Sequence, residues 1–361
     1  MNNIYRKENV TQLPHMTGEM NTIVNAQRRC IQKELKNYIF SSKVPIKIQK
    51  ELIPERGGKP IINIVVTTWR SGSTFIGGVL DSHPGTYHFS EPLTEFKTVQ
   101  IRGEPLASQA IKVLHNLLNC NFIETDKYLK VSKKNQHRLF THNTRLWESC
   151  KNKKEICFLP EFLTPMCKLF PFVSMKIVHL RLRLIESLLE DQELNLKVVY
   201  LVRDPRGTMR SRYMQPWCRK QPDCGDVGRL CADLIDDYAA ALRLKQLHPT
   251  KFIVVRYEDM SLNAIKEISN MFDFLGLYYS PKVQQFVTEH TTRNNSHAYK
   301  TYRDSSIVPL QWRQKLSFQI VDKIQQKCSI AMAAWGYLPV DNESNLRLFN
   351  PLVEPFNLPV T

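Results

Sequence analysis

The chain has 361 residues and a formal net charge of +16, with 50 Lys and Arg against 34 Asp and Glu. That length is enough for one large α/β domain with insertions or for two small domains, each with its own core. The positive charge indicates anionic ligands. The sequence carries neither zinc-finger spacing nor an RNA-recognition signature, so we expect no nucleic-acid partner.

The first 58 residues are predicted to be an N-terminal extension. They are polar and basic, and apolar side chains recur at helical spacing only around residues 24–38. The first 60 residues hold no apolar run of about 18 residues and no signal-peptide core. We therefore expect one helix here and no membrane anchor within this sequence.

A strand, an anion-binding loop, a helix and a second strand are predicted over residues 59–93. The β-branched run 61–66 indicates a strand buried on both faces, and Gly72 then allows a tight turn. Backbone N–H groups and hydroxyls follow at the start of a helix, whose dipole favours an anion. The loop lacks the Gly-Lys-Ser/Thr ending of nucleotide-triphosphate loops. Arg70 stands where a lysine would be expected there, and its fork suits a doubly anionic group.

Residues 94–171 have less regular apolar spacing and several basic patches, with an amphipathic helix predicted over 105–118. Two interpretations stay open for this segment. It is either an acceptor-binding insertion built on a rigid scaffold, or a structural excursion held by disulfides. Three of the nine cysteines lie within it, at Cys150, Cys157 and Cys167.

Strands and helices alternate over the rest of the chain, which predicts βαβ units and a mostly parallel sheet with helices on both faces. Ligands of such sheets bind beyond the carboxyl ends of the strands. The predicted strands are 87–90, 173–180, 197–202 and 252–256, and the predicted helices are 182–190, 230–247, 264–275 and 318–335.

A second anion-binding motif follows the strand 197–202. Arg203 is expected at the carboxyl end of that strand, and Pro205 suits the first turn of a helix. Ser211 lies eight residues beyond Arg203, about two helical turns away. Two anion sites on strands of one parallel sheet imply a ligand with charged groups at both ends. Arg206 is either a further phosphate ligand or a solvated helix charge.

The two motifs, TTWRSGSTF at 67–75 and VRDPRGTMRSR at 202–212, resemble the donor-binding motifs of Golgi carbohydrate sulfotransferases. The resemblance is strongest to the branch that sulfates the 6-hydroxyl of galactose, N-acetylgalactosamine or N-acetylglucosamine. It extends over residues 60–339, with further matches at 89–93, 255–260, 312–313 and 335–337. It implies a P-loop-like sulfotransferase fold, as a single domain with insertions over residues 59–340 and a loosely packed tail over 341–361. The implied donor is 3′-phosphoadenylyl sulfate, and the implied acceptor is a glycan or glycosaminoglycan.

The resemblance also assigns roles to the site residues. Arg203 and Ser211 match the residues that hold the 3′-phosphate, and Arg313 matches, more loosely, a late basic loop near the donor. Arg70 is the candidate for stabilising charge on the bridging oxygen. The loop that would hold the 5′-phosphosulfate comprises Thr68, Trp69, Arg70, Ser71, Gly72, Ser73, Thr74 and Phe75.

Glu91, just after the strand 87–90, is the candidate general base for the acceptor hydroxyl, provided that partial burial raises its pKa. The alternative is that Glu91 pairs structurally with an arginine. His88 is a neighbouring candidate, but strand alternation turns it away from Glu91 and favours a buried structural role. Lys176 interrupts an apolar strand, and either contacts a ligand at the rim or extends along the strand to solvent. Tyr257 and Glu258 suit core hydrogen bonding at least as well as ligand contact.

Nine cysteines favour a disulfide-bearing lumenal protein over buried free thiols, and glycosylation sequons at Asn9, Asn294 and Asn342 agree with the secretory route. Relatives of the resembled family are anchored in the Golgi membrane by an N-terminal helix. We therefore expect this N-terminus to be incomplete or alternative, with membrane attachment only through an anchor outside this sequence. The sequence offers no metal-ligand set, and sulfuryl transfer needs no metal.

Two other functions remain open from the sequence alone. The first is a P-loop kinase for a small molecule, which the missing P-loop lysine disfavours. The second is a catalytically inactive glycan-binding protein that keeps a basic groove, which the joint presence of Arg70, Glu91, Arg203 and Ser211 disfavours.

Overall fold

A computed structural model of the chain describes residues 16–40, 49–136, 140–292 and 307–359. Its centre is a five-stranded, all-parallel sheet with the strand order β2-β3-β1-β4-β5. Each predicted strand is confirmed, with bounds that differ by at most a few residues. The strands are β1 (Ile61–Val66), β2 (Thr86–Ser90), β3 (Phe172–Ile177), β4 (Leu196–Val202) and β5 (Phe252–Arg256).

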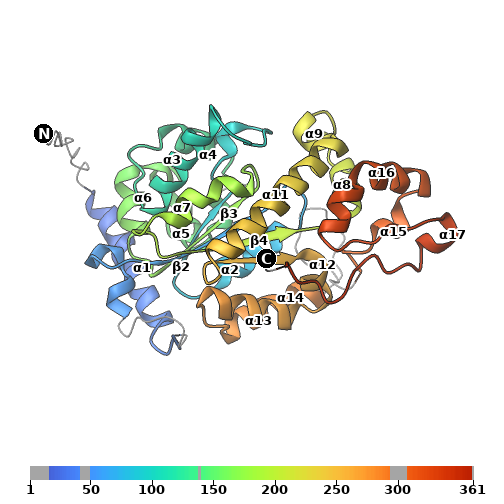
Figure 1. Cartoon of the computed structure of the whole chain (residues 1–361). Helices are drawn as coiled ribbons and strands as arrows, with labels where there is room; N and C mark the ends of the chain where they lie inside the picture. The colour runs from blue at the N-terminus through green and yellow to red at the C-terminus, as the bar shows by residue number, and fades with distance from the viewer. Residues whose placement is uncertain (1–15, 41–48, 137–139, 293–306, 360–361) are drawn as a thin grey trace, which may run out of the picture.

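Every residue of β1, β2 and β3 is buried, because helices cover both faces of the sheet. One face carries α2 (Ser73–Ser82), α13 (Ala264–Leu275) and α14 (Pro281–Thr292). The other carries α7 (Glu186–Glu190) and α11 (Val227–Leu247), as Figure 1 shows. The prediction of a parallel sheet between two helical layers is therefore confirmed.

The N-terminal extension contributes to the core. Its helix α1 (Gly18–Glu34) begins at the N-cap Thr17, earlier than the predicted start, and it buries Met20, Val24 and Ile31. It packs against α5 (Thr144–Cys150) and α6 (Pro160–Cys167) of the insertion. An ion pair of 2.7 Å between Arg145 and Glu34 strengthens this contact.

The insertion between β2 and β3 also holds α3 (Leu106–Leu118) and α4 (Asp126–Lys134). Two disulfides, Cys120–Cys167 and Cys150–Cys157, close loops within it. Two more link later segments. Cys218–Cys224 joins α9 (Pro216–Arg219) to α10 (Pro222–Gly225), and Cys231–Cys328 joins α11 to α16 (Phe318–Ala334). The sequence predicted disulfides but not these pairings.

The C-terminal tail is largely exposed, as expected, but several contacts fix it to the domain. Tyr337 and Leu352 form an antiparallel bridge, and Arg256 of β5 donates to the carbonyl oxygen of Val353 at 3.0 Å. Phe356 packs against the buried Trp335. A short helix, α17 (Glu343–Leu346), starts at Asn342, the sequon residue that the structure describes. The other two sequons, at Asn9 and Asn294, lie outside the described residues.

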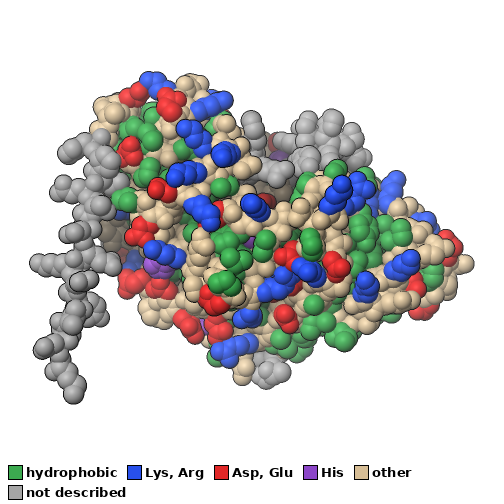
Figure 2. Space-filling model, turned by 90° about the horizontal axis from the view of Figure 1, so that it is seen from above, with side chains coloured by type: hydrophobic (Ala, Val, Ile, Leu, Met, Phe, Trp, Pro, Cys, Tyr) green, Lys and Arg blue, Asp and Glu red, His purple; other side chains and the backbone are tan. Residues whose placement is uncertain are grey.

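Charged side chains of both signs are mixed on one face of the molecule. On the face seen in Figure 2, Lys and Arg side chains are interspersed with Asp and Glu and form no continuous basic stripe. Across the described ranges, no helix has both the length and the apolar character needed to cross a membrane. Within the same ranges, no group of three His, Cys, Asp or Glu side chains could hold a metal ion.

Candidate active site

The first anion loop runs from the end of β1 to the start of α2, and its inner side is held by hydroxyl groups. Thr67 donates to the carbonyl oxygen of Leu201 at 2.5 Å, and Ser71 donates to that of Thr68 at 2.7 Å. Thr67 and Ser71 are completely buried, so these bonds shape the loop from within. The hydroxyls of Ser73 and Thr74 begin α2, where Thr74 is exposed.

Gly72 is the N-cap of α2 and has a φ of 92°, in the left-handed region that favours glycine. A Cβ added there would lie 2.2 Å from the ring of Tyr257, so the space also requires glycine. Tyr257, which begins α12 (Tyr257–Leu262), stacks in turn on the guanidinium of Arg203 at 4.3 Å. This contact brings the anion loop, the end of β4 and the end of β5 together.

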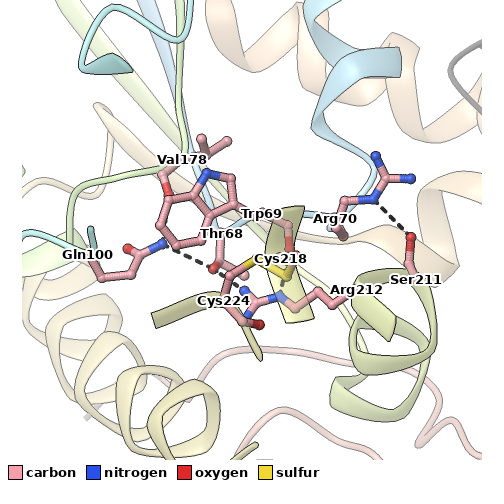
Figure 3. The surroundings of a disulfide bond; sticks show 9 residues. All are labelled: Thr68, Trp69, Arg70, Gln100, Val178, Ser211, Arg212, Cys218 and Cys224. Carbon is pink, nitrogen blue, oxygen red and sulfur yellow. Dashed lines mark hydrogen bonds between the residues drawn. A yellow bond between two sulfur atoms is a disulfide. The ribbon is translucent and has the colours of Figure 1, made fainter. Parts of the chain in front are cut away.

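The two anion motifs meet at the carboxyl ends of the neighbouring strands β1 and β4. The Nε of Arg70 donates to Oγ of Ser211 at 3.0 Å, and Nη1 of Arg203 donates to the carbonyl oxygen of Arg70 at 2.9 Å. Ser211 lies on α8 (Pro205–Tyr213), whose first residue is the predicted proline. Figure 3 shows Arg70 and Ser211 facing each other. The predicted convergence of the two motifs is therefore present.

Backbone strain marks both candidate catalytic residues. Arg70 and Glu91 have φ values of 69° and 50°, which non-glycine residues rarely adopt. Such conformations cost about 1–3 kcal/mol each and cluster at active sites, where the surrounding structure holds them.

Glu91 follows β2 and pairs with Lys176 of β3, whose Nζ donates to Oε1 at 2.8 Å. Burial alone would raise the pKa of Glu91, but the charge of Lys176, with smaller contributions from His179 and His142, lowers it to about 2. The expectation of a raised pKa is therefore wrong, and the partner of Glu91 is a lysine rather than an arginine. The Glu91 side chain keeps 28% of its surface exposed, so the carboxylate is both ionised and accessible.

Three histidines lie near the ion pair of Glu91 and Lys176. His88 is buried and its Nδ1 lies 2.8 Å from Oγ of Ser174, which fits the expected structural role. Burial lowers the pKa of His179 to about 4, and His179 is therefore neutral at physiological pH. His142, on an exposed turn of the insertion, is close enough to Glu91 and Lys176 for its pKa to respond to both. Sequence reasoning missed His142 and His179, because neither belongs to a motif.

Two arginines of the predicted motifs take structural positions. Arg206 is completely buried, pairs with Asp204 at 2.8 Å and stacks on Trp312 at 4.2 Å, so it is neither solvated nor turned toward the anion loop. Arg313 lies on α15 (Trp312–Lys315), which packs against α8, and its guanidinium donates to the carbonyl oxygen of Phe349 in the tail.

Glu258 serves the core, as one of the two interpretations expected. It is completely buried and accepts hydrogen bonds from the backbone N–H of Asp204 at 3.1 Å and from the Tyr337 hydroxyl at 2.8 Å. Burial, together with the nearby Asp204, raises the pKa of Glu258 to about 7.

Arg212 is the main residue of this region that sequence reasoning passed over. It ends the second motif, and its guanidinium donates to three acceptors near the anion loop, one of them Oγ1 of Thr68 at 2.6 Å. Trp69 packs against the Cys218–Cys224 disulfide. The side chains of Thr68 and Trp69 thus point toward this support and not toward Ser211 (Figure 3).

Comparison with known proteins agrees with this geometry. The chain is similar to carbohydrate sulfotransferase 1 of Danio rerio, at 26% identity over 79% of each chain. It is also similar to carbohydrate sulfotransferase 4 of Mus musculus (26%, 80% of this chain and 85% of that one) and carbohydrate sulfotransferase 6 of Homo sapiens (25%, 81% and 84%).

Among solved structures, the sulfotransferase domain of the Synechococcus olefin synthase has a TM-score of 0.42 at 17% identity, covering 75% of this chain and 95% of that one. That likeness is too weak to carry an argument. The family model described as "Sulfotransferase domain" matches residues 62–336, which include both anion motifs and all five strands except the first residue of β1. Because this match spans most of the sequence, the chain belongs to the sulfotransferase family and is a sulfotransferase enzyme.

Proposed function

We propose that this sulfotransferase moves a sulfuryl group from 3′-phosphoadenylyl sulfate to a sugar hydroxyl of a glycan, at the 6-position of N-acetylglucosamine, galactose or N-acetylgalactosamine. The observation that carries the proposal is the junction of Arg70, Ser211 and Arg203 at adjoining strand ends. A sugar acceptor is supported by the similarity to carbohydrate sulfotransferases.

The residues at this junction fit a donor with two anionic groups. Nε of Arg203 is buried and has no hydrogen-bond partner among the described residues, so the guanidinium keeps hydrogen-bonding capacity beyond its bond to Arg70. The N-terminus of α2 adds backbone N–H groups and a favourable dipole on the other side of Arg70. Arg203 and Ser211 would hold the 3′-phosphate, and the loop of residues 68–75 would hold the 5′-phosphosulfate.

The reaction forms a bond between the acceptor oxygen and sulfur and breaks the bond between sulfur and the bridging oxygen. The electron pair of the broken bond stays on the departing phosphate. Arg70 would stabilise that developing charge, since positioning and charge stabilisation dominate in analogous phosphoryl transfer. Glu91 is ionised at neutral pH, but its pKa of about 2 makes it a weak base, so it would accept the proton only as the acceptor oxygen bonds to sulfur and its hydroxyl becomes strongly acidic.

The long insertion between β2 and β3 is the proposed acceptor-binding segment. It begins three residues after Glu91, and His142 from its middle lies in the electrostatic environment of Glu91. The four disulfides support residence in an oxidising compartment such as the Golgi lumen.

A transfer assay tests the proposal. The purified chain is incubated with the ³⁵S-labelled donor and a panel of desulfated glycans, and in a parallel arm with γ-labelled ATP. We expect sulfate on a hexose or hexosamine, mapped by mass spectrometry to the 6-hydroxyl, and no transfer from ATP. Label transfer from ATP would favour the small-molecule kinase. Binding of glycans without binding of the desulfated nucleotide would favour the inactive glycan-binding protein.

A further inference from the structure

The buried guanidinium of Arg212 connects α8 to two other segments, the first anion loop and the loop of the Cys218–Cys224 disulfide. It donates to Oγ1 of Thr68 at 2.6 Å, to the carbonyl oxygen of Trp69 at 3.2 Å and to that of Cys224 at 2.8 Å. Two of these acceptors belong to the first anion loop. Arg212 is therefore a direct hydrogen-bonded support of that loop, on the side away from Ser211 (Figure 3).

This arginine is costly to the fold. It is 1% exposed, and no carboxylate among the described residues lies within ion-pair distance of it. Burial, reinforced by the like charge of Arg181, lowers the pKa of Arg212 to about 9. Asp233 and Asp223 offset part of this charge from a longer distance, but burying a cation without a direct ion pair still destabilises a protein, which indicates that its hydrogen bonds serve the neighbouring site. One such role is electrostatic: the charge of Arg212 lies beneath the first anion loop and would attract an anion bound there, and the attraction is stronger in the low dielectric of the interior.

The third acceptor is fixed by the Cys218–Cys224 disulfide, which closes a loop with a sequence separation of only 6. The disulfide packs with Trp69 and Val178 in a small apolar cluster. The same loop is anchored on its other side through Asp223, which accepts hydrogen bonds from the N–H of Gln100 at 2.8 Å and from Arg102 at 3.0 Å. The loop thus stands between the anion loop and the insertion, and cannot shift without breaking these contacts.

We propose that Arg212 is a positioning residue for the sulfuryl donor and that the Cys218–Cys224 disulfide keeps it in place, so that breaking either loosens the anion loop and weakens donor binding. This inference rests on the proposed donor. It predicts a specific pattern: the donor Michaelis constant rises, whereas the acceptor Michaelis constant stays unchanged.

The first test compares Arg212→Met and Arg212→Lys, with Arg219→Met as the matched control because Arg219 is an exposed arginine of the same disulfide loop. Binding of 3′-phosphoadenosine 5′-phosphate is measured by calorimetry, beside kinetics in both substrates and the unfolding midpoint. We expect Arg212→Met to weaken nucleotide binding about tenfold or more, since each hydrogen bond to a charged group contributes about that factor. Arg212→Lys keeps the charge and one bond, and should fall between Arg212→Met and the wild type.

The second test removes the disulfide. Cys218→Ser/Cys224→Ser should raise the donor Michaelis constant several-fold, whereas Cys150→Ser/Cys157→Ser, which opens a loop of similar sequence separation in the insertion, should not. Thr68→Val, combined with Arg212→Lys, completes a double-mutant cycle, and non-additive effects on nucleotide affinity are expected.

Folded variants of both kinds that bind the nucleotide as tightly as the wild type would overturn the inference. If Arg212→Met does not fold, Arg212→Lys, Thr68→Val and the disulfide variant decide the question by the same measurement. A wild-type protein that neither binds the nucleotide nor transfers the label would overturn the proposed function instead, which keeps the two failures distinct.

Discussion

At the residue scale, the contact between Arg70 and Ser211 ties the two anion motifs together across 141 residues of sequence. Ser211→Ala removes the acceptor for Nε of Arg70 and a hydroxyl from the proposed 3′-phosphate site. We expect the donor Michaelis constant to rise about tenfold, the usual effect of one charge-assisted hydrogen bond. Arg70→Ala should mainly lower the turnover number.

A double-mutant cycle checks this assignment. Because the two side chains touch, their effects on the specificity constant for the donor should be non-additive by about 0.5–3 kcal/mol. Strict additivity would mean that Arg70 and Ser211 act on the donor independently, against the geometry of the junction.

The pairing of Glu91 with Lys176 sets a pH dependence. Because the pKa of Glu91 is lowered to about 2, Glu91 stays ionised from neutral pH down to that value and imposes no acidic limb on the rate between pH 4 and 8. Lys176→Met removes the charge that opposes burial, so the pKa of Glu91 should rise above its ordinary value and the rate should fall on the acidic side. The profile of kcat/KM against pH measures this shift.

Two further variants complete that experiment, one as a lysine control and one that removes the carboxylate. Lys197→Met alters another strand lysine, which donates to the carbonyl oxygen of Phe274 instead, and should leave the pH profile unchanged. Glu91→Gln should cut the turnover number by about 10²–10⁴ with donor binding intact, the usual contribution of a general base. An unfolded Glu91→Gln protein would instead assign Glu91 a structural role.

At the scale of elements, the turn from β1 into α2 depends on one glycine. Gly72→Ala places a Cβ 2.2 Å from the Tyr257 ring and leaves a non-glycine residue at a φ of 92°. We expect a loss of stability of about 1–3 kcal/mol together with weaker donor binding, because the loop must move to relieve the contact. Chemical unfolding and donor kinetics measure the two effects.

Gly18→Ala is the control for that substitution. It also lies at the first turn of a helix, but no atom comes within 4 Å of an added Cβ there. Its stability should match the wild type or exceed it slightly. A Gly72→Ala protein as stable and active as the control would show that the loop tolerates displacement.

The elements predicted best from the sequence are those whose residues are apolar because the element itself is buried. β1 and β4 are apolar runs bounded by turn residues, so both their existence and the position of Arg203 at a strand end could be predicted. The start of α1 was missed because its first turn, after Thr17, is polar and solvent-exposed, whereas the predicted start followed the apolar spacing. Strand alternation predicted that both anion motifs lie at strand ends of one sheet, but not the direct contact between Arg70 and Ser211.

What sequence could not predict depends on which distant side chains meet. Lys176 reaches Glu91 only because β3 lies beside β2, and that pairing reverses the expected direction of the pKa shift. From the sequence, Arg206 could be a phosphate ligand or a solvated helix charge, whereas in the structure Asp204 and Trp312 enclose it. The role of Arg212 required the fold of the disulfide loop, which no local pattern specifies.

At the scale of the whole molecule, one hydrophobic core joins the N-terminal helix, the sheet, the insertion and the tail. The Cys231–Cys328 disulfide joins two of its long helices across a sequence separation of 97, whereas Cys150–Cys157 spans 7. The chain-entropy account then predicts a loss of about 4–5 kcal/mol on breaking the long-range bridge and about 2 kcal/mol for the short one. Denaturant unfolding of Cys231→Ser/Cys328→Ser and Cys150→Ser/Cys157→Ser compares the two, and equal midpoints would contradict that account.

The strand order has a consequence for how such an enzyme could change its target. The proposed nucleotide site lies at the ends of the central strand β1 and its neighbour β4, whereas the insertion that starts beside Glu91 leaves from the edge strand β2 and returns at β3. The sequence of the insertion can therefore change during evolution while the residues of the proposed nucleotide site are kept. Exchanging residues 103–171 between two relatives, which keeps the Gln100 and Arg102 contacts to Asp223, is accordingly expected to transfer sugar preference and leave nucleotide affinity with the recipient.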